Sequence, residues 1–280
     1  MNVLILGLGG ESFEIRGKQL GGAIGARIAK RPQTEDLRWA DLVVLIKRAG
    51  FEYASAVQAA RKPIVWDALD YWHQPIENAW DEASARNLAK WCLSVIRPKL
   101  TVCATQAMAD AHDGVYLPHH ARPGLTAMPV KEKIEIVAYE GVPKYLGRWA
   151  KAISKECQRR GWTFVINPPN LATADLIVAL RDGEWDGWMC RQWKSGVKYV
   201  NAMAAHRPVI TQESAAWREL SGFGWVVETP AHLEQAFDLC DDAFREEVAE
   251  LTEAAMEFDY SLEAVAVDYR AMLEQVLVTC

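Results

Sequence analysis

The sequence predicts an α/β protein of two domains, each built on a parallel sheet with helices on both faces. Short apolar segments alternate with segments of helical period, which is the pattern of strands buried between helices. This alternation occurs in both halves of the chain, with strands expected at residues 3–6, 41–46, 63–66 and 101–105 and again at 134–138, 163–167 and 176–180. With 280 residues, 50% of them hydrophobic, the chain can form two cores.

The first half begins with a strand, a glycine-rich loop at residues 7–10 and a helix from about residue 15. A dinucleotide-binding G-x-G-x-x-G motif would need glycine where Ser12 stands, so this loop does not support a nicotinamide-dependent oxidoreductase. Helices are then expected over residues 53–61, 77–97 and 106–112, the second of them ended by Pro98.

Residues 115–124, VYLPHHARPG, have the composition of a linker, and we place the domain boundary after residue 122. His119 and His120 are adjacent in sequence and have no ligand-spaced partner, so we interpret them as polar linker residues and expect no metal site. Beyond the linker, a helix is expected over residues 143–160, and acidic amphipathic helices are expected over 244–258 and 261–277.

The composition argues against several classes of protein. A net charge of −6 gives no overall basic field for nucleic acid, although a local basic face stays compatible with it. Six cysteines without a C-x-x-C pair, and an N-terminus without a secretory pattern, favour the cytoplasm, of the host if the protein is viral. No window reaches about 20 uncharged apolar residues, so we expect no membrane span.

An anion site is predicted where a helix is expected to begin, near Ser195. Exposed backbone N–H groups and the helix dipole favour negative charge at such a start, and Lys194 and Lys198 lie one turn apart. The helical period places both lysines and Asn201 on a polar face opposite a buried one. Phosphate is the expected ligand; the alternative is an ordinary amphipathic helix with solvated lysines.

The segment that follows resembles a known family. NAMAAHRPVI, residues 201–210, is similar to the donor-site helix and strand of GT-B glycosyltransferases, which typically read E-A-M-A-x-G-x-P-V-V. The similarity continues through the loop to Glu219 and through FGWVVETPAHLEQAF, residues 223–237. The family's paired acids would fall at Trp193 and Asn201, which are not acidic, and its glycine is replaced by His206, which would need a left-handed backbone or a different helix exit.

This resemblance implies two Rossmann-like domains facing across a cleft. Residues 1–122 would bind the acceptor, residues 123–258 the nucleotide sugar, and residues 259–280 would form a C-terminal helix that packs back on the first domain. The donor, expected to be a uridine-linked sugar such as UDP-glucose, is a co-substrate, and no cofactor or metal is implied. The diphosphate would lie near the residues that follow parallel strands or begin the helix: Gly141, Lys144, Arg181, Lys194, Ser195 and Lys198. Glu219 would bind hydroxyls of the donor sugar or ribose, and Asn201 the ribose.

Acceptor chemistry is expected after the strand at residues 63–66, where Asp67, Asp70 and His73 lie close together in the sequence. Any of the three could take the acceptor proton, as an inverting transferase requires. The alternative is that the two aspartates cap a turn and a helix. The sequence leaves the identity of the acceptor open. It could be a 5-hydroxymethylpyrimidine in viral DNA, whose phosphates would be contacted by the basic pairs Lys30-Arg31, Lys47-Arg48 and Arg61-Lys62. A saccharide, a lipid-linked acceptor or a small molecule is the alternative.

Two other functions are compatible with the same architecture. A sugar-nucleotide 2-epimerase would bind the same diphosphate and need no acceptor. A non-catalytic nucleotide-sugar or glycan-binding protein would agree with the missing glutamates.

Overall fold

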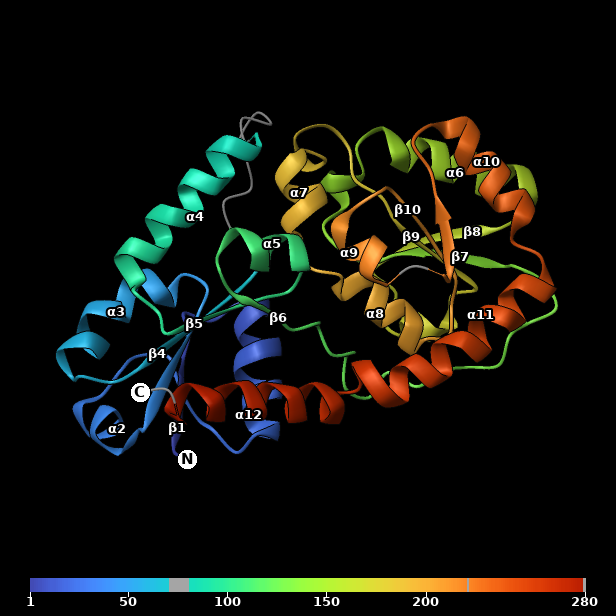
Figure 1. Ribbon diagram of the computed structural model, residues 1–280. Helices are drawn as coiled ribbons and strands as arrows, with labels where there is room; N and C mark the ends of the chain where they lie inside the picture. Colours follow the sequence, from blue (N-terminus) through green and yellow to red (C-terminus); the bar gives the residue numbers. More distant parts are fainter. Residues whose placement is uncertain (71–80, 221, 279–280) are drawn as a thin grey trace.

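The computed structural model describes residues 1–70, 81–220 and 222–278. It contains two α/β domains side by side, each with its own parallel sheet (Figure 1). This confirms the fold class. His73 lies outside the described residues. No helix of the described ranges is both long and apolar enough to cross a membrane.

The first sheet has six strands in the order β2-β1-β3-β4-β5-β6, with neighbours parallel. The strands are β1 (Val3–Leu6), β2 (Arg27–Ala29), β3 (Leu42–Ile46), β4 (Ile64–Leu69), β5 (Leu100–Cys103) and β6 (Val115–Tyr116). Its helices are η1 (Phe13–Leu20), α1 (Gly21–Ala23), α2 (Thr34–Trp39), α3 (Ala49–Ala59), α4 (Glu82–Ile96) and α5 (Gln106–Ala111). The central strands are buried throughout because helices cover both faces.

The second sheet has five strands in the order β11-β10-β9-β7-β8, again with parallel neighbours. They are β7 (Ile136–Tyr139), β8 (Thr163–Ile166), β9 (Leu176–Ala179), β10 (Val209–Thr211) and β11 (Gly224–Val226). The strand order reverses its direction at the β7/β9 pair, and ligands of open α/β sheets bind beside such switch points, beyond the carboxyl ends of the strands.

The helical elements of the second half include two that the sequence suggests, near residues 143–160 and from about Ser195, and several that it does not. They are η3 (Pro143–Leu146), α6 (Arg148–Arg160), η4 (Leu171–Thr173), η5 (Gly183–Trp185), α7 (Trp188–Trp193), α8 (Val197–Ala204), α9 (Ala215–Glu219) and α10 (Pro230–Leu239). The helix expected over residues 143–160 is divided at Gly147, whose φ of 48° is left-handed.

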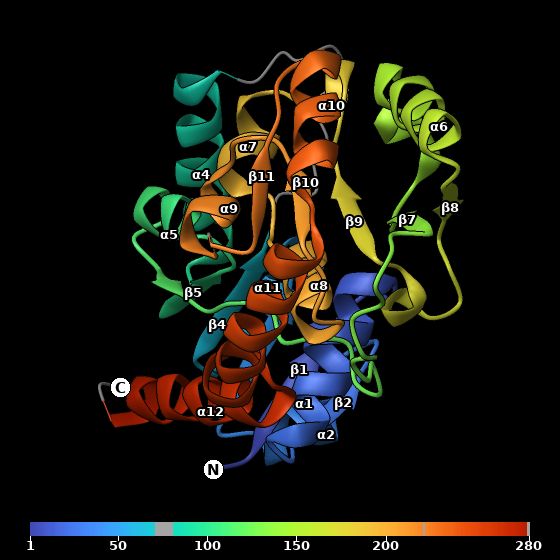
Figure 2. The ribbon, with the colours of Figure 1, turned by 90° about the vertical axis from the view of Figure 1, so that its right-hand side faces the viewer.

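The C-terminal helices join the two domains. α11 (Asp242–Ala255) packs on α8 of the second domain, the short η6 (Met256–Tyr260) follows, and α12 (Leu262–Val278) lies against the first domain (Figures 1 and 2). Val265, Tyr269 and Leu273 of α12 are buried in the same cluster as Val3 and Ile5 of β1. The expected C-terminal crossing is therefore confirmed, whereas the exact boundaries at residues 122 and 258 stay a prediction.

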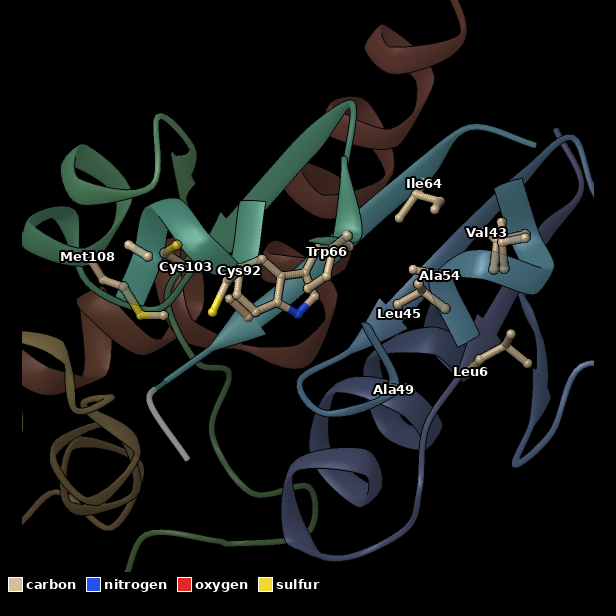
Figure 3. Packing of buried hydrophobic residues seen from close by; sticks show 14 of the residues in the cluster. Leu6, Val43, Leu45, Ala49, Ala54, Ile64, Trp66, Cys92, Cys103 and Met108 are labelled. Carbon is tan, nitrogen blue, oxygen red and sulfur yellow. The ribbon is translucent and has the colours of Figure 1, made fainter. Parts of the chain in front are cut away.

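One core cluster extends from the first domain into the second. Figure 3 shows Trp66 of β4 packed near Cys92, Cys103 and Met108, and the same cluster includes Met189 and Trp193 of α7. Trp193 is 1% exposed, and its ring lies 5.2 Å from the ring of His112. Apolar packing by α7 thus fixes the start of α8 against the first domain.

Candidate active site

A pocket opens at the carboxyl ends of β9 and β10, beside the switch point of the second sheet. Its lining comes from these strand ends, α7, the start of α8 and the loop after β10: Ala179, Arg181, Asp186, Cys190, Arg191, Lys194, Ser195, Val197, Lys198, Tyr199, Thr211, Gln212, Glu213 and Ser214. Four of these residues are basic and two are acidic, so the lining has a formal charge of +2. Four predicted donor residues, Arg181, Lys194, Ser195 and Lys198, are brought together here.

Two of the basic side chains have shielded nitrogens without a hydrogen-bond partner among the described residues. These atoms are Nζ of Lys198 and Nη1 of Arg181. Lys198 as a residue is partly exposed, but Nζ itself is covered and lies 4.0 Å from the centroid of the Tyr139 ring. Burial, followed by the charges of Arg181 and Lys194, lowers the pKa of Lys198 well below its usual range. Such donors are suited to bind an anion.

Gly141 lies directly beside this ammonium group. A Cβ atom built on Gly141 would come within 2.9 Å of Lys198 Nζ, and the glycine has a φ of 139°. Its backbone N–H donates to Oδ1 of Asn167 at 2.7 Å, which fixes the loop after β7. Only glycine allows this close approach with this backbone conformation.

Lys194 is paired across the domain boundary. Asp70, which follows β4 of the first domain, forms ion pairs with Lys194 and with Lys47 and accepts a hydrogen bond of 3.3 Å from Oγ of Ser195. Burial raises the pKa of Asp70, but Lys194 and Lys47 outweigh burial, and the net pKa is far below the usual carboxyl range. Asp70 is therefore an ionised carboxylate at the boundary of the pocket.

The start of α8 differs from the expectation. The helix begins at Val197, close to the expected start near Ser195, but its N-cap residue is Gly196, so no side chain caps it, and Ser195 Oγ donates to Asp70. The expected polar face is also wrong: Asn201 is buried, like the residues on the opposite side of the helix, because α8 is enclosed between the second sheet and α11. The lysines reach the pocket from the ends of α7 and α8, not from a solvated helix face.

One wall of the pocket is a polar network that the sequence did not indicate. Gln212 accepts a hydrogen bond from the backbone N–H of Arg181 at 2.7 Å and donates to Asp186 at 2.9 Å. Arg191 in turn donates to Asp186 at 2.8 Å and to Glu228 at 3.1 Å. Arg191 is therefore neutralised by two carboxylates, which leaves Arg181 and Lys198 as the cations of the pocket without such partners among the described residues.

A hydroxyl group also belongs to the pocket. The Tyr199 hydroxyl lies 2.9 Å from Oγ1 of Thr211 and 3.2 Å from Oγ of Ser214. Beside them Glu213 pairs with Arg218 at 2.8 Å. These groups can exchange hydrogen bonds with the hydroxyls of a carbohydrate.

Solved structures of glycosyltransferases match essentially the whole chain. AviGT4, a glycosyltransferase involved in avilamycin A biosynthesis, aligns with a TM-score of 0.65 at 11% identity and covers 100% of this chain and 98% of its own. A glycosyltransferase from Rickettsia africae ESF-5 gives a TM-score of 0.65 at 10% identity, over 99% and 98%. For the spinosyn rhamnosyltransferase SpnG the TM-score is 0.54 at 11% identity, over 96% and 100%. The fold is GT-B.

Comparisons of the sequence itself give no match. No protein-family model matches it, and no curated protein sequence does either. The structural similarity therefore establishes the GT-B architecture, and the chemistry has to be argued from the pocket.

Several predicted site residues lie outside the GT-B pocket. Lys144 is exposed, with Nζ 4.8 Å from the Trp185 ring. Asn201 donates to Glu140 at 2.9 Å and accepts from the backbone N–H of Arg122 at 3.0 Å, which attaches the linker to β7. The side-chain nitrogen and oxygen of Asn201 are thus both hydrogen-bonded within the protein.

Glu219 also contacts the other domain. Its carboxylate accepts a hydrogen bond of 2.7 Å from the backbone N–H of Gln106, at the start of α5, and burial raises its pKa. His206, at the position of the family glycine, has a φ of 55°, so the left-handed backbone occurs here with an unusual residue.

Asp67 lies inside the first domain. Its side chain is fully buried in β4, accepts a hydrogen bond of 3.2 Å from Tyr269 of α12, and lies 3.9 Å from Nε of Arg16. Of the three predicted acid–base residues, the described structure thus brings only Asp70 to the pocket.

Gln212 was missed as a site residue, although it directly follows β10 and the rule that carboxyl ends of parallel strands share one edge would have selected it. Lys47, which directly follows β3, was expected to contact a DNA acceptor, and its ion pair with Asp70 was not predicted. Asp186 follows a short 3₁₀ turn, and no sequence signal predicts its position.

Proposed function

We propose that the protein transfers a sugar from a nucleoside-diphosphate donor, a UDP-sugar such as UDP-glucose, to a hydroxyl group of an acceptor. The observation that carries this proposal is the pair of shielded nitrogens, Lys198 Nζ and Arg181 Nη1, that have no hydrogen-bond partner among the described residues, in a pocket whose lining has a formal charge of +2. A diphosphate has complementary charge and several acceptor oxygens. The GT-B fold supports the same class of donor.

The basic side chains would assist departure of the leaving group. When the glycosidic bond to the nucleotide breaks, negative charge grows on the leaving diphosphate, and fixed cations next to it stabilise this charge. We propose that Lys198, Arg181 and Lys194 have this role, so that the reaction needs no metal. Activity that persists in excess chelator would support this part of the proposal, and loss of activity restored by a divalent cation would contradict it.

Asp70 is our candidate for the group that receives the acceptor hydroxyl. It is ionised and lies next to Lys194 and Ser195 at the pocket boundary, where a hydroxyl donated to it would face the donor. Because the pKa of Asp70 is low, it is a weak base toward an ordinary alcohol. Proton transfer would then follow formation of the new bond from oxygen to carbon, when the hydroxyl proton is strongly acidic.

For the acceptor we propose a hydroxymethylated pyrimidine of DNA. Lys30 and Arg31 follow β2 and Arg48 follows β3, and all three are exposed at the sheet edge from which Lys47 reaches Asp70. This position would allow contacts with phosphates on both sides of a target base. Saccharide, lipid-linked and small-molecule acceptors are the alternatives that an experiment must separate.

The test is a transfer screen. Several nucleotide sugars are incubated with the protein, with and without hydroxymethylated DNA, unmodified DNA and simple saccharides, and products are read by mass spectrometry. A mass increase of one hexose on hydroxymethylated DNA confirms the proposal. An isomerised sugar nucleotide without transfer would show an epimerase, and tight donor binding without turnover on any acceptor would show a binding protein.

Substitution of Lys198 tests the donor site itself. Lys198→Ala removes a charge-assisted contact worth about 1.5–3 kcal/mol, so affinity for UDP should fall by about 10- to 150-fold in titration calorimetry. Lys155→Ala, an exposed lysine of α6, is the matched control and should bind UDP like the wild type. Equal UDP affinity in the Lys198 variant and the wild type would count against the assignment of this pocket.

A further inference from the structure

The ammonium group of Lys198 has an environment that does not suit a permanent charge. Its Nζ is shielded from solvent, has no hydrogen-bond acceptor among the described residues, and contacts the face of the Tyr139 ring at 4.0 Å. The ring gives weak stabilisation to a cation, whereas removal of an ammonium from water without a partner costs several kcal/mol. These surroundings favour the neutral amine of Lys198 over its ammonium form.

The charges around Lys198 act in the same direction. Arg181 and Lys194 both disfavour a further positive charge on Lys198. The two acids of the pocket do not offset them, since Asp186 is paired with Arg191 and Glu213 with Arg218.

The carboxylate of Asp70 also has partners other than Lys198. Asp70 forms ion pairs with Lys47 and Lys194 and accepts a hydrogen bond from Ser195. No carboxylate among the described residues is within ion-pair distance of Lys198. The phenol of Tyr139 is neutral, since burial raises its pKa above the ordinary value of about 10.

We propose that binding of the donor diphosphate is coupled to the uptake of one proton by Lys198. This step rests on the donor site proposed above. The proton comes from solvent and bonds to the lone pair of Nζ, and no other bond forms or breaks. The diphosphate supplies the negative charge that the pocket lacks around Nζ, so the ammonium form becomes stable only in the complex.

The coupling has a catalytic consequence. A charged Lys198 would be present beside the diphosphate oxygens when the bond to the sugar breaks, and it would lose its proton again when the nucleoside diphosphate leaves. Affinity for the nucleotide should accordingly fall by up to tenfold for each pH unit between the pKa of Lys198 in the free protein and its higher pKa in the complex.

Calorimetry tests this without measuring turnover. UDP is titrated into the protein at one pH in two buffers of different ionisation enthalpy, and the difference in observed enthalpy gives the number of protons exchanged. The titrations are repeated from about pH 6 to about pH 9, because Lys198 takes up a proton only between its pKa in the free protein and its higher pKa in the complex. We expect the uptake to rise toward one proton per UDP within this range.

Two variants assign the proton. Lys198→Arg keeps a permanent cation and should bind UDP with about one proton less uptake than the wild type. Lys194→Arg should retain the uptake because Lys194 already has Asp70 as its partner. If Lys198→Arg is unfolded by circular dichroism, Lys198→Gln replaces it, with the same expected loss of uptake.

The outcomes separate this inference from the proposed function. UDP binding without proton uptake at any pH, or an uptake that disappears in Lys194→Arg but persists in Lys198→Arg, overturns the coupling and leaves the donor site standing. If neither UDP nor inorganic pyrophosphate binds, the donor site itself is wrong and the coupling fails with it.

Discussion

At the scale of single residues, the pocket is defined by which of its charges already have partners. Lys194 has Asp70, and Arg191 has Asp186 and Glu228, whereas Lys198 Nζ and Arg181 Nη1 have no hydrogen-bond acceptor among the described residues. Because a shielded cation without a partner is costly, an incoming anion gains most at these two residues. A count of basic residues alone would not distinguish them from the paired ones.

Gly141→Ala tests how closely the loop after β7 must approach Lys198. The new methyl group would lie within 2.9 Å of Nζ, and a φ of 139° is strained for alanine. We expect UDP affinity to fall by about 10-fold or more and stability by about 1–3 kcal/mol, measured by calorimetry and thermal unfolding. Gly22→Ala is the control, since nothing lies within 4 Å of its Cβ position. Unchanged UDP affinity in Gly141→Ala would contradict the approach of the diphosphate to this loop.

Residues that follow a strand were the most predictable part of the site. Arg181 and Asp70 were selected from their places just after apolar segments, and both lie at the pocket or its boundary. The partners of these residues could not be predicted. Glu219 and Asn201 were selected by resemblance to a family motif, but their side chains are bonded to Gln106, Glu140 and the backbone of Arg122, contacts that depend on the relative placement of the two domains and the linker.

At the scale of elements, the C-terminal helix holds a buried polar contact as well as an apolar face. Tyr269 of α12 donates to Asp67 of β4 at 3.2 Å, and both side chains are fully buried. Burial raises the pKa of Asp67, and this effect outweighs the opposite influence of Arg16 and Tyr269. The fold therefore favours the protonated form of Asp67.

Asp67→Asn should remove a pH-dependent cost of docking α12. A carboxyl group whose pKa is raised in the folded state does not lower the free energy of unfolding below its unfolded pKa of about 3.9. The free energy of unfolding falls as pH rises through the folded pKa, and the loss persists at higher pH. Asparagine can accept the Tyr269 hydrogen bond and does not titrate. The variant should therefore match the wild-type melting temperature near pH 4 and exceed it near pH 7.

Tyr269→Phe is the control for this prediction. It removes the hydrogen bond but keeps the ring, so it should lower the melting temperature at both pH values by the equivalent of about 1–3 kcal/mol. An Asp67→Asn variant that is less stable than the wild type near pH 7 would show that Asp67 is instead an ionised partner of Arg16.

The strands were easier to predict than the short helices. Strands β1, β3 and β9 are continuous apolar segments because helices cover both faces of their sheets, and this composition is visible in the sequence. Helix α7 has six residues, and its buried residues Met189 and Trp193 pack on the other domain, so no local periodicity could identify it. Its burial against α4 and α5 is nevertheless what brings Lys194 to Asp70.

At the scale of the whole molecule, the two domains are joined by a small number of polar contacts around the pocket. Thr105 donates to the backbone of Gln192 at 3.0 Å, Gln106 donates to Glu219, and Asp70 pairs with Lys194. Only the last of these contacts involves a side chain that lines the donor pocket. An anion bound next to Lys194 would therefore also affect this contact between the domains.

Asp70→Asn should therefore weaken the contact between the domains and change the response to nucleotide. Loss of one partner of a buried ion pair typically costs about 3–5 kcal/mol, and here Lys47 and Lys194 would be left without a carboxylate, so the melting temperature should fall markedly near pH 7. Since the wild-type carboxyl group has a lowered pKa, its contribution is present above the unfolded pKa and is lost as pH falls through the folded one.

The response to UDP distinguishes an electrostatic role of Asp70 from a purely structural one. In Asp70→Asn the diphosphate can replace the missing negative charge next to Lys194, so saturating UDP should raise the melting temperature of the variant by more than that of the wild type. Glu82→Gln is the matched control, because its pair with Arg86 is exposed, lies outside the pocket lining and is worth about 1 kcal/mol or less. The opposite result would be a variant with a lowered melting temperature that UDP does not raise. It would mean that Asp70 positions Lys194 for binding of the diphosphate and does not merely neutralise its charge.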